Sequence, residues 1–173
     1  MKIVLIGYMG SGKTTIGNLL SSILKTPFYD LDAFIEKKEQ QSISDIFSLK
    51  GELYFRKKET TYLKELLKKE EKLIIALGGG TPCFSNNLDL LHIKPDILTI
   101  YLKTTYKTLA TRLFDEKNQR PLIAHISTYE DLQDFIKKHL FERSFYYSQS
   151  NYTINTDQLT PKELVEKIIL QLF

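Results

Sequence analysis

The 173-residue sequence predicts an α/β fold in which helices cover both faces of a parallel sheet. Two observations lead to this fold class. Short apolar runs of strand type alternate with amphipathic helical segments along the whole chain, and the connections are long enough for the crossovers that parallel strands require. The length suits one domain with a sizeable core, so we expect residues 1–173 to form a single domain without a linker or an internal repeat.

The predicted strands are short apolar runs that end at glycine, proline or polar residues. The run from 73 to 77, for example, is continuously apolar and stops at a run of three glycines, as expected of a strand buried on both faces. The five segments are residues 2–6, 28–32, 73–77, 97–102 and 152–155.

The predicted helices carry apolar residues at helical spacing or begin at capping signals. The first helix, from Thr14, stops at Thr26 because the proline that follows restricts the residue before it. Ser127 with Glu130 and Thr160 with Glu163 have the form of capping boxes. The first box begins a helix that runs to about residue 147, and the second begins the C-terminal helix. The other helices are expected over residues 31–38, 44–49, 52–69 and 105–113.

Composition favours an ordinary globular protein, with 42% hydrophobic and 26% charged residues. A net charge of +3, scattered along the chain, does not argue for nucleic acid. No apolar run approaches the roughly 20 residues of a membrane helix, and Met1 leads directly into the first strand, so neither a membrane span nor a signal peptide is expected. The single cysteine, Cys83, fits a reducing compartment and is interpreted as a small buried hydrophobe in preference to a reactive thiol. We therefore expect a cytoplasmic protein.

Residues 7–14 read Gly-Tyr-Met-Gly-Ser-Gly-Lys-Thr and lie between a predicted strand and a predicted helix. This spacing is typical of a phosphate-binding loop, because glycines allow backbone N–H groups to turn toward phosphate oxygens at a helix N-terminus. Lys13 would bridge the β- and γ-phosphates, and the Thr14 hydroxyl would bind Mg²⁺. The loop predicts binding of a nucleoside triphosphate without naming a reaction. A GTP-binding switch protein would use the same loop, but the Asn-Lys-x-Asp tetrapeptide usual in such proteins is missing from the sequence.

Two acids end the second predicted strand, where ligands gather in open α/β sheets. Asp30 and Asp32 are two residues apart, so in a strand their side chains would point to the same side. One could hold the water shell of the metal, and the other could accept a proton from an attacking alcohol. The alternative is a helix N-cap beside a surface acid.

Three further features have a functional and a structural interpretation. Arg56 and Glu59 are neighbours on one helix face and could form an ordinary surface ion pair. The glycines at 78–80 could expose backbone N–H groups to a ligand or form a flexible turn. Arg120, in a polar segment between two helices, could close over transferred phosphate, and Arg143 could hold a carboxylate, but each taken singly could be ordinary surface.

Taken together, these pieces make the chain similar to the shikimate kinase family, within the nucleoside-monophosphate-kinase-like P-loop enzymes. The resemblance rests on the order and intervals of Gly-Tyr-Met-Gly-Ser-Gly-Lys-Thr-Thr, Tyr-Asp-Leu-Asp, Ile-Phe-Ser-Leu-Lys-Gly-Glu, Phe-Arg-Lys-Lys-Glu, Gly-Gly-Gly, Arg-Pro-Leu and Glu-Arg-Ser-Phe-Tyr-Tyr. It covers nearly the whole chain and implies a three-layer P-loop NTPase fold, with a five-stranded parallel sheet flanked by helices and a lid at about 113–126. Gln40 departs from the glycine that is frequent in the family, which puts only a local turn in doubt.

The resemblance implies that MgATP phosphorylates the 3-hydroxyl of shikimate, a step toward the aromatic amino acids. The protein is expected to be a monomer. Asp32, Lys13 and Arg120 would be catalytic, and Thr14 and Asp30 would hold Mg²⁺. Shikimate would contact Asp32, Arg56, Gly79 and Arg143, with Glu59 orienting Arg56. The residues that would contact ATP are Gly10, Ser11, Gly12, Lys13, Thr14, Thr15, Arg112, Arg120 and Gln158.

Two other functions stay open from the residues alone. A gluconate or nucleotide kinase would share the phosphate loop and the lid, but it would not require Phe-Arg-x-x-Glu together with Asp-x-Asp and Gly-Gly-Gly. A catalytically silent regulator on the same fold usually loses the lysine, the base or the lid arginine, whereas Lys13, Asp32 and Arg120 are all present here. Release of ADP that depends on shikimate would separate these alternatives.

Overall fold

A five-stranded parallel sheet with the order β2-β3-β1-β4-β5 organises the chain, as described by a computed structural model for residues 1–69 and 71–172. The strands are β1 (Lys2–Ile6), β2 (Phe28–Asp30), β3 (Leu73–Ala76), β4 (Ile97–Lys103) and β5 (Tyr152–Asn155). The predicted parallel sheet is therefore confirmed, and its strands lie close to the predicted ranges. The main difference is that β2 ends at Asp30, two residues earlier than predicted, because helix α2 begins at Leu31.

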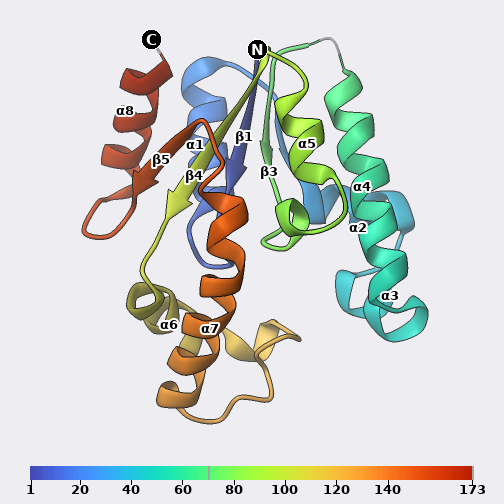
Figure 1. Cartoon of the computed structure of the whole chain (residues 1–173), viewed down its shortest axis with the longest axis vertical. Helices are drawn as coiled ribbons and strands as arrows, with labels where there is room; N and C mark the ends of the chain where they lie inside the picture. Colours follow the sequence, from blue (N-terminus) through green and yellow to red (C-terminus); the bar gives the residue numbers. More distant parts are fainter. Residues whose placement is uncertain (70, 173) are drawn as a thin grey trace.

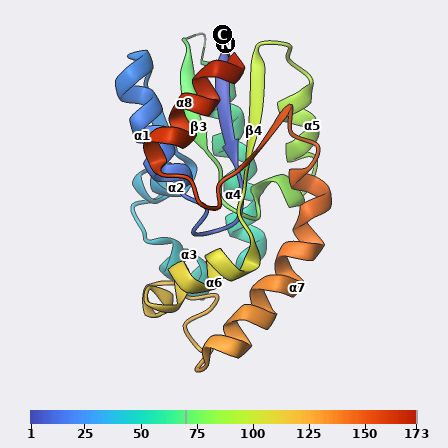
Figure 2. The same ribbon diagram turned by 90° about the vertical axis from the view of Figure 1, so that its left-hand side faces the viewer.

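The central strand β1 divides the core between the two faces of the sheet. Its residues are all buried, and successive side chains point to opposite faces. Ile3 and Leu5 pack with α1 (Lys13–Leu24) and α8 (Pro161–Leu172). Val4 and Ile6 pack into the larger cluster on the other face. Figures 1 and 2 show the resulting three layers, with α1 and α8 together on one side of the sheet.

The larger cluster lies on the other face, and the remaining helices contribute apolar residues to it. They are α2 (Leu31–Glu39), α3 (Ile43–Lys50), α4 (Glu52–Lys68), α5 (Asn87–His92), α6 (Tyr106–Phe114) and α7 (Tyr129–Tyr147). Short 3₁₀ turns cover Thr81–Cys83 and Lys117–Gln119. The sequence did not predict these turns or α5, because each is too short to show periodicity.

Side-chain caps fix the beginnings of the C-terminal helices. The capping box at α8 is confirmed: Thr160 N donates to Glu163 at 2.7 Å, and Glu163 N donates to the Thr160 hydroxyl at 3.3 Å. The box predicted from Ser127 and Glu130 is wrong by one residue. The N-cap of α7 is Thr128, whose backbone is extended and whose hydroxyl accepts from Asp131 N at 3.1 Å.

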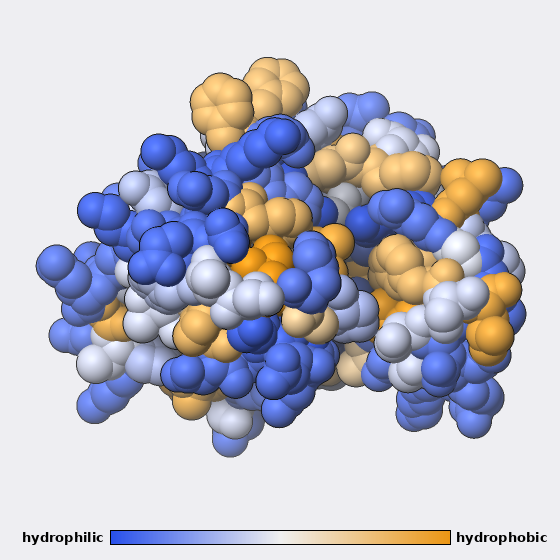
Figure 3. Space-filling view, turned by 90° about the horizontal axis from the view of Figure 1, so that it is seen from below, coloured by the Kyte–Doolittle hydropathy of each residue, from blue (hydrophilic) through white to orange (hydrophobic). Residues whose placement is uncertain are grey.

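The carboxyl ends of the strands meet at one end of the molecule. There the loop after β1, the end of β2 and the glycine run after β3 lie on neighbouring strands, near α6 and the segment that joins α6 to α7 (Figure 1). Seen from below in Figure 3, the surface is mainly hydrophilic, with hydrophobic side chains gathered in places between the polar ones. Within the described residues, no helix combines the length and apolar character needed to cross a membrane.

Candidate active site

The phosphate loop is already folded around its own lysine. Gly10 and Gly12 have φ angles of +79° and +94°, which side chains with a Cβ rarely adopt, and Gly12 forms the N-cap of α1. Lys13 Nζ is buried and donates to the carbonyls of Gly7 at 2.8 Å and Tyr8 at 2.9 Å. Burial lowers the pKa of Lys13 to about 8, although the nearby Asp32 and Asp30 oppose this shift. The free N–H groups of α1 therefore face the pocket beside a fixed ammonium group.

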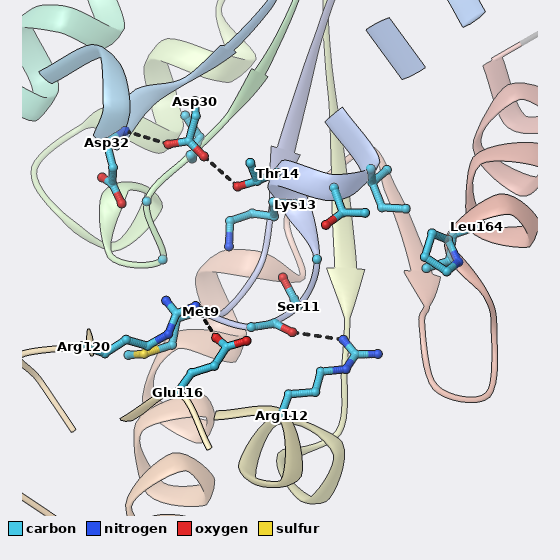
Figure 4. A pocket seen from close by; sticks show the side chains of 18 of the residues that line it. Met9, Ser11, Lys13, Thr14, Asp30, Asp32, Arg112, Glu116, Arg120 and Leu164 are labelled. Atoms are coloured by element: carbon cyan, nitrogen blue, oxygen red, sulfur yellow. Dashed lines mark hydrogen bonds and ion pairs between the residues drawn. The ribbon is translucent and has the colours of Figure 1, made fainter. Parts of the chain in front are cut away.

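Asp30 has two structural roles at once. As the last residue of β2 it caps α2, where its Oδ1 accepts from the N–H groups of Asp32 at 3.1 Å and Ala33 at 3.3 Å. Its other oxygen accepts from the Thr14 hydroxyl at 2.7 Å. The structural alternative, an N-cap, is therefore correct for Asp30, but the same carboxylate also lines the pocket (Figure 4).

Asp32 lies in the first turn of α2 and not in a strand, so strand alternation is not what places it beside Asp30. It lines the same pocket because the helix begins at the pocket edge (Figure 4). Burial, followed by the charges of Glu59 and Asp30, raises the pKa of Asp32 to about 6. A carboxyl with this pKa can exchange a proton near neutral pH.

Thr14 and Asp30 fit a magnesium ion by the chemistry of their donors. Both present oxygen atoms to the pocket, 2.7 Å apart, beside the loop that would hold phosphate. Mg²⁺ prefers oxygen ligands and is usually held by one or two protein groups together with phosphate and water. Among the described residues no group of three or more acidic, histidine or cysteine side chains could enclose a metal.

The glycine run at 78–80 is where the predicted acceptor residues come together. A Cβ at Gly78 would lie 3.0 Å from Asp32 Oδ1, and one at Gly79 would lie 3.0 Å from Arg143 Nη1. A Cβ at Gly80 would lie 2.5 Å from Arg56 Nη2, so a side chain there would require the guanidinium to move. The absence of side chains therefore lets an acid from α2 and arginines from α4 and α7 approach the same short segment. This explains the glycines better than a flexible turn does.

The Arg56–Glu59 pair joins a half-buried arginine to a buried acid and is not an ordinary surface contact. Glu59 is fully buried, accepts from Arg56 Nη1 at 2.9 Å and also accepts from the Thr81 hydroxyl. A second carboxylate, Glu52, lies 3.4 Å from Arg56 Nε. Two acids on α4 thus fix the Arg56 guanidinium against Gly80.

The pocket of about 570 Å³ extends from Asp32 across the phosphate loop to the start of α8. Arg112 Nη1 donates to the Gly10 carbonyl at 3.0 Å, and Arg120 pairs with Glu116 at 3.0 Å, so both arginines reach the pocket from the α6 side (Figure 4). Gln158 is exposed and does not line this pocket. At that end, the lining residues are Leu159, Pro161 and Leu164.

Some lining residues were not predicted from the sequence. Met9, Glu116, Leu159, Pro161 and Leu164 line the pocket, but a methionine, a surface acid and apolar helix-start residues carry no chemical signature. Cys83 is partly buried against the larger core cluster, and burial raises the pKa of its thiol, in keeping with the interpretation as a small hydrophobe.

The chain is similar to known proteins in sequence and in fold. A family model described as shikimate kinase matches residues 9–173. The shikimate kinase of Flavobacterium johnsoniae is 49% identical over 168 residues, which are 97% of this chain and 96% of that protein. A crystal structure of shikimate kinase from Bacteroides thetaiotaomicron has a TM-score of 0.90 at 33% identity and covers 99% of this chain and 98% of its own. The shikimate kinase from Acinetobacter baumannii in complex with shikimate has a TM-score of 0.86 at 35% identity, covering 99% and 92%.

Proposed function

Since the chain belongs to the shikimate kinase family, we propose that it transfers the γ-phosphoryl group of MgATP to the 3-hydroxyl of shikimate, with Asp32 as the proton acceptor. The observation that carries the assignment of residues is the meeting of Asp32, Arg56 and Arg143 at the glycine run, next to the phosphate loop. An anionic alcohol bound there would have its carboxylate near two guanidinium groups and a hydroxyl near a carboxylate base.

The donor side of the pocket is proposed to bind ATP. The N–H groups of residues 10–15 would contact the phosphates at the start of α1, and Lys13 would reach the β- and γ-phosphates. Thr14 would ligate Mg²⁺ directly and Asp30 through water, and the bound ion would supply positive charge against the phosphate oxygens. The apolar residues at the start of α8 would lie against the adenine ring of ATP, and Arg112 would lie beside them.

The acceptor side is proposed to bind shikimate. Arg56 and Arg143 would hold its carboxylate in two-pronged contacts, and Gly79 would donate its N–H. In the transfer, the 3-hydroxyl oxygen bonds to the γ-phosphorus while the bond from phosphorus to the β–γ bridging oxygen breaks. The hydroxyl proton passes to Asp32, which begins the reaction ionised, since its pKa of about 6 lies below neutral pH.

The segment at about 113–126 is proposed as a lid. Arg120 ends its 3₁₀ turn and lines the pocket, where its only ion pair among the described residues is with the exposed Glu116. Exchanging this partner for the transferred phosphate would therefore cost little. Arg120 would then stabilise the charge on the γ-phosphoryl group as the lid excludes water.

We also propose that residues 1–173 act as one domain and as a monomer. The proposed location is the cytoplasm, because a free cysteine stays reduced there. Light scattering during size-exclusion chromatography would test the oligomeric state, with a dimer mass contradicting it.

The activity itself is tested by coupling ADP release to NADH oxidation with purified protein, MgATP and either shikimate or gluconate. We expect ADP release that depends on shikimate, none with gluconate, and loss of most of the rate in Asp32→Asn. ADP release with gluconate would favour the other kinase class, and no release with either acceptor would favour a silent nucleotide-binding regulator. A crystal structure with shikimate and ADP would then show whether Asp32, Arg56, Gly79 and Arg143 contact one molecule.

A further inference from the structure

We propose that Tyr8 and His139 are positioning residues that fix the Arg143 guanidinium above the glycine run for the carboxylate of the acceptor. This proposal rests on the proposed function, and it adds a residue of the phosphate loop and a residue of α7 to the acceptor site.

The two arginines at the glycine run are held in different ways. Arg56 has a buried carboxylate partner in Glu59 and an exposed one in Glu52. Across the residues that the structure describes, no carboxylate forms an ion pair with Arg143. The charge of Arg143 is therefore left for an anionic ligand. A long side chain without such a partner needs another contact to hold it, or ligand binding must order it at an entropic cost.

One contact that holds Arg143 is aromatic. Its guanidinium carbon lies 5.7 Å from the centroid of the Tyr8 ring, within the range of a cation–π interaction. The Tyr8 ring is itself buried, with 1% of its surface exposed, so it offers a rigid surface. Tyr147, one turn after Arg143 on α7, donates its hydroxyl to the Gly79 carbonyl at 2.6 Å, on the same side of Gly79 as the Arg143 guanidinium.

His139 holds the Tyr8 ring in turn. The Tyr8 hydroxyl and His139 Nδ1 share a hydrogen bond of 2.9 Å, and the two rings meet edge to face with centroids 5.5 Å apart. His139 lies one helical turn before Arg143, so α7 supplies both the anchor of the tyrosine and the arginine that rests on it. Burial, with the Arg143 charge, lowers the pKa of His139 to about 4, so the imidazole is neutral near pH 7.

Tyr8 also touches the donor side of the site. Its carbonyl accepts from Lys13 Nζ at 2.9 Å, while its ring faces Arg143. One residue thus sets the positions of a phosphate-binding cation through its backbone and of an acceptor-binding cation through its side chain. Misplacement of a binding group by about 1 Å can cost a large factor in rate, so the tyrosine hydroxyl and its histidine partner should matter to acceptor binding.

The test measures steady-state kinetics of Tyr8→Phe and His139→Leu, each alone and combined with Arg143→Ala, with shikimate and ATP varied separately. We expect each single variant to raise KM for shikimate about five- to thirty-fold, while kcat and KM for ATP change by less than about twofold. In the Arg143→Ala background neither should raise KM for shikimate further, because their effect acts through Arg143. His139→Asn, whose amide can replace Nδ1 in the hydrogen bond, should restore most of the affinity. Lys138→Ala, an exposed neighbour on α7, serves as the matched control and should behave as wild type.

Several results would overturn the proposal. An unchanged KM for shikimate, equal losses for both substrates, or additive effects in the Arg143→Ala background would each show that the pair has only a structural role. Tyr8 is buried, so its variant could fail to fold. In that case His139→Leu and His139→Asn alone distinguish a positioning role from a purely structural one. Wild-type protein without shikimate-dependent ADP release would instead refute the proposed function itself, a result that the same assay distinguishes.

Discussion

Asp32 is predicted to lower the stability of the folded protein at the pH at which it works. Its environment raises the pKa of the carboxyl from 3.8 to about 6, mainly by burial and then by the charges of Glu59 and Asp30. The folded state therefore binds this proton more tightly than the unfolded state, so ionisation opposes folding. Replacing Asp32 by Asn removes the ionisation while keeping the size and most of the polarity of the side chain.

The magnitude follows from the two pKa values. Below pH 3.8 the group is protonated in both states and costs nothing, and as the pH rises through about 6 the folded state loses stability that it does not regain. Each pKa unit corresponds to about 1.4 kcal/mol, so a difference of about 2 units lowers the free energy of unfolding by on the order of 3 kcal/mol. Asp32→Asn should therefore be more stable than wild type by about 3 kcal/mol at pH 8 and by about half of that at pH 5.

The assay is urea unfolding of the ligand-free proteins, followed by circular dichroism at several pH values between 5 and 8. A variant that is no more stable than wild type at pH 8, or whose advantage is the same at pH 5 and pH 8, would refute the assigned pKa. The same variant should lose about 10²- to 10⁴-fold in kcat while keeping its affinity for ATP, because the phosphate contacts lie on α1. Collapse of ATP binding would contradict the role of Asp32 as a proton acceptor.

Three further predictions concern the other parts of the site. Arg143→Ala should raise KM for shikimate about ten- to a hundred-fold and leave KM for ATP nearly unchanged, since it removes a charged hydrogen-bond donor; steady-state kinetics with an unchanged KM for shikimate would show the clamp to be misplaced. Affinity of the free enzyme for MgATP, measured by calorimetry, should fall above about pH 8 as Lys13 loses its proton, and Lys13→Met should bind weakly at every pH; a pH-independent affinity in wild type would contradict this. Hydrogen exchange of residues 113–126 should slow when shikimate and an unreactive ATP analogue are bound together, and exchange indifferent to both ligands would contradict lid closure.

Local patterns in the sequence predicted the parallel sheet and the phosphate loop because both depend on neighbouring residues. For the acids at the end of the second strand, the sequence predicted the pocket but not the elements that carry them. Both reach the pocket, but Asp30 does so as a helix cap and Asp32 from inside α2, since capping ended the strand two residues earlier than its apolar pattern indicated.

Contacts between distant residues could not be predicted from spacing. Tyr8 and His139 are 131 residues apart, and the fold brings them together only because the phosphate loop and α7 lie at the same end of the sheet. The packing of Arg56 against Gly80 is similar, because a glycine run does not reveal which side chain will occupy the space it leaves. Such pairings depend on the whole topology.

The short strand β2 gives the sheet an edge whose stability depends on ligands. It pairs with β3 through Phe28, Tyr29 and Asp30, and the described part of the chain places no strand on its other side. Asp30, at its end, is bonded to Thr14 on α1 and caps α2. A ligand that binds only while Thr14 and Asp30 are in place would raise the free energy of local opening at this edge by RT ln(1 + L/Kd), where L is the free ligand concentration. The stability of the shortest strand in the described sheet would thus depend on whether the nucleotide site is filled, and so would that of the helix that carries Asp32.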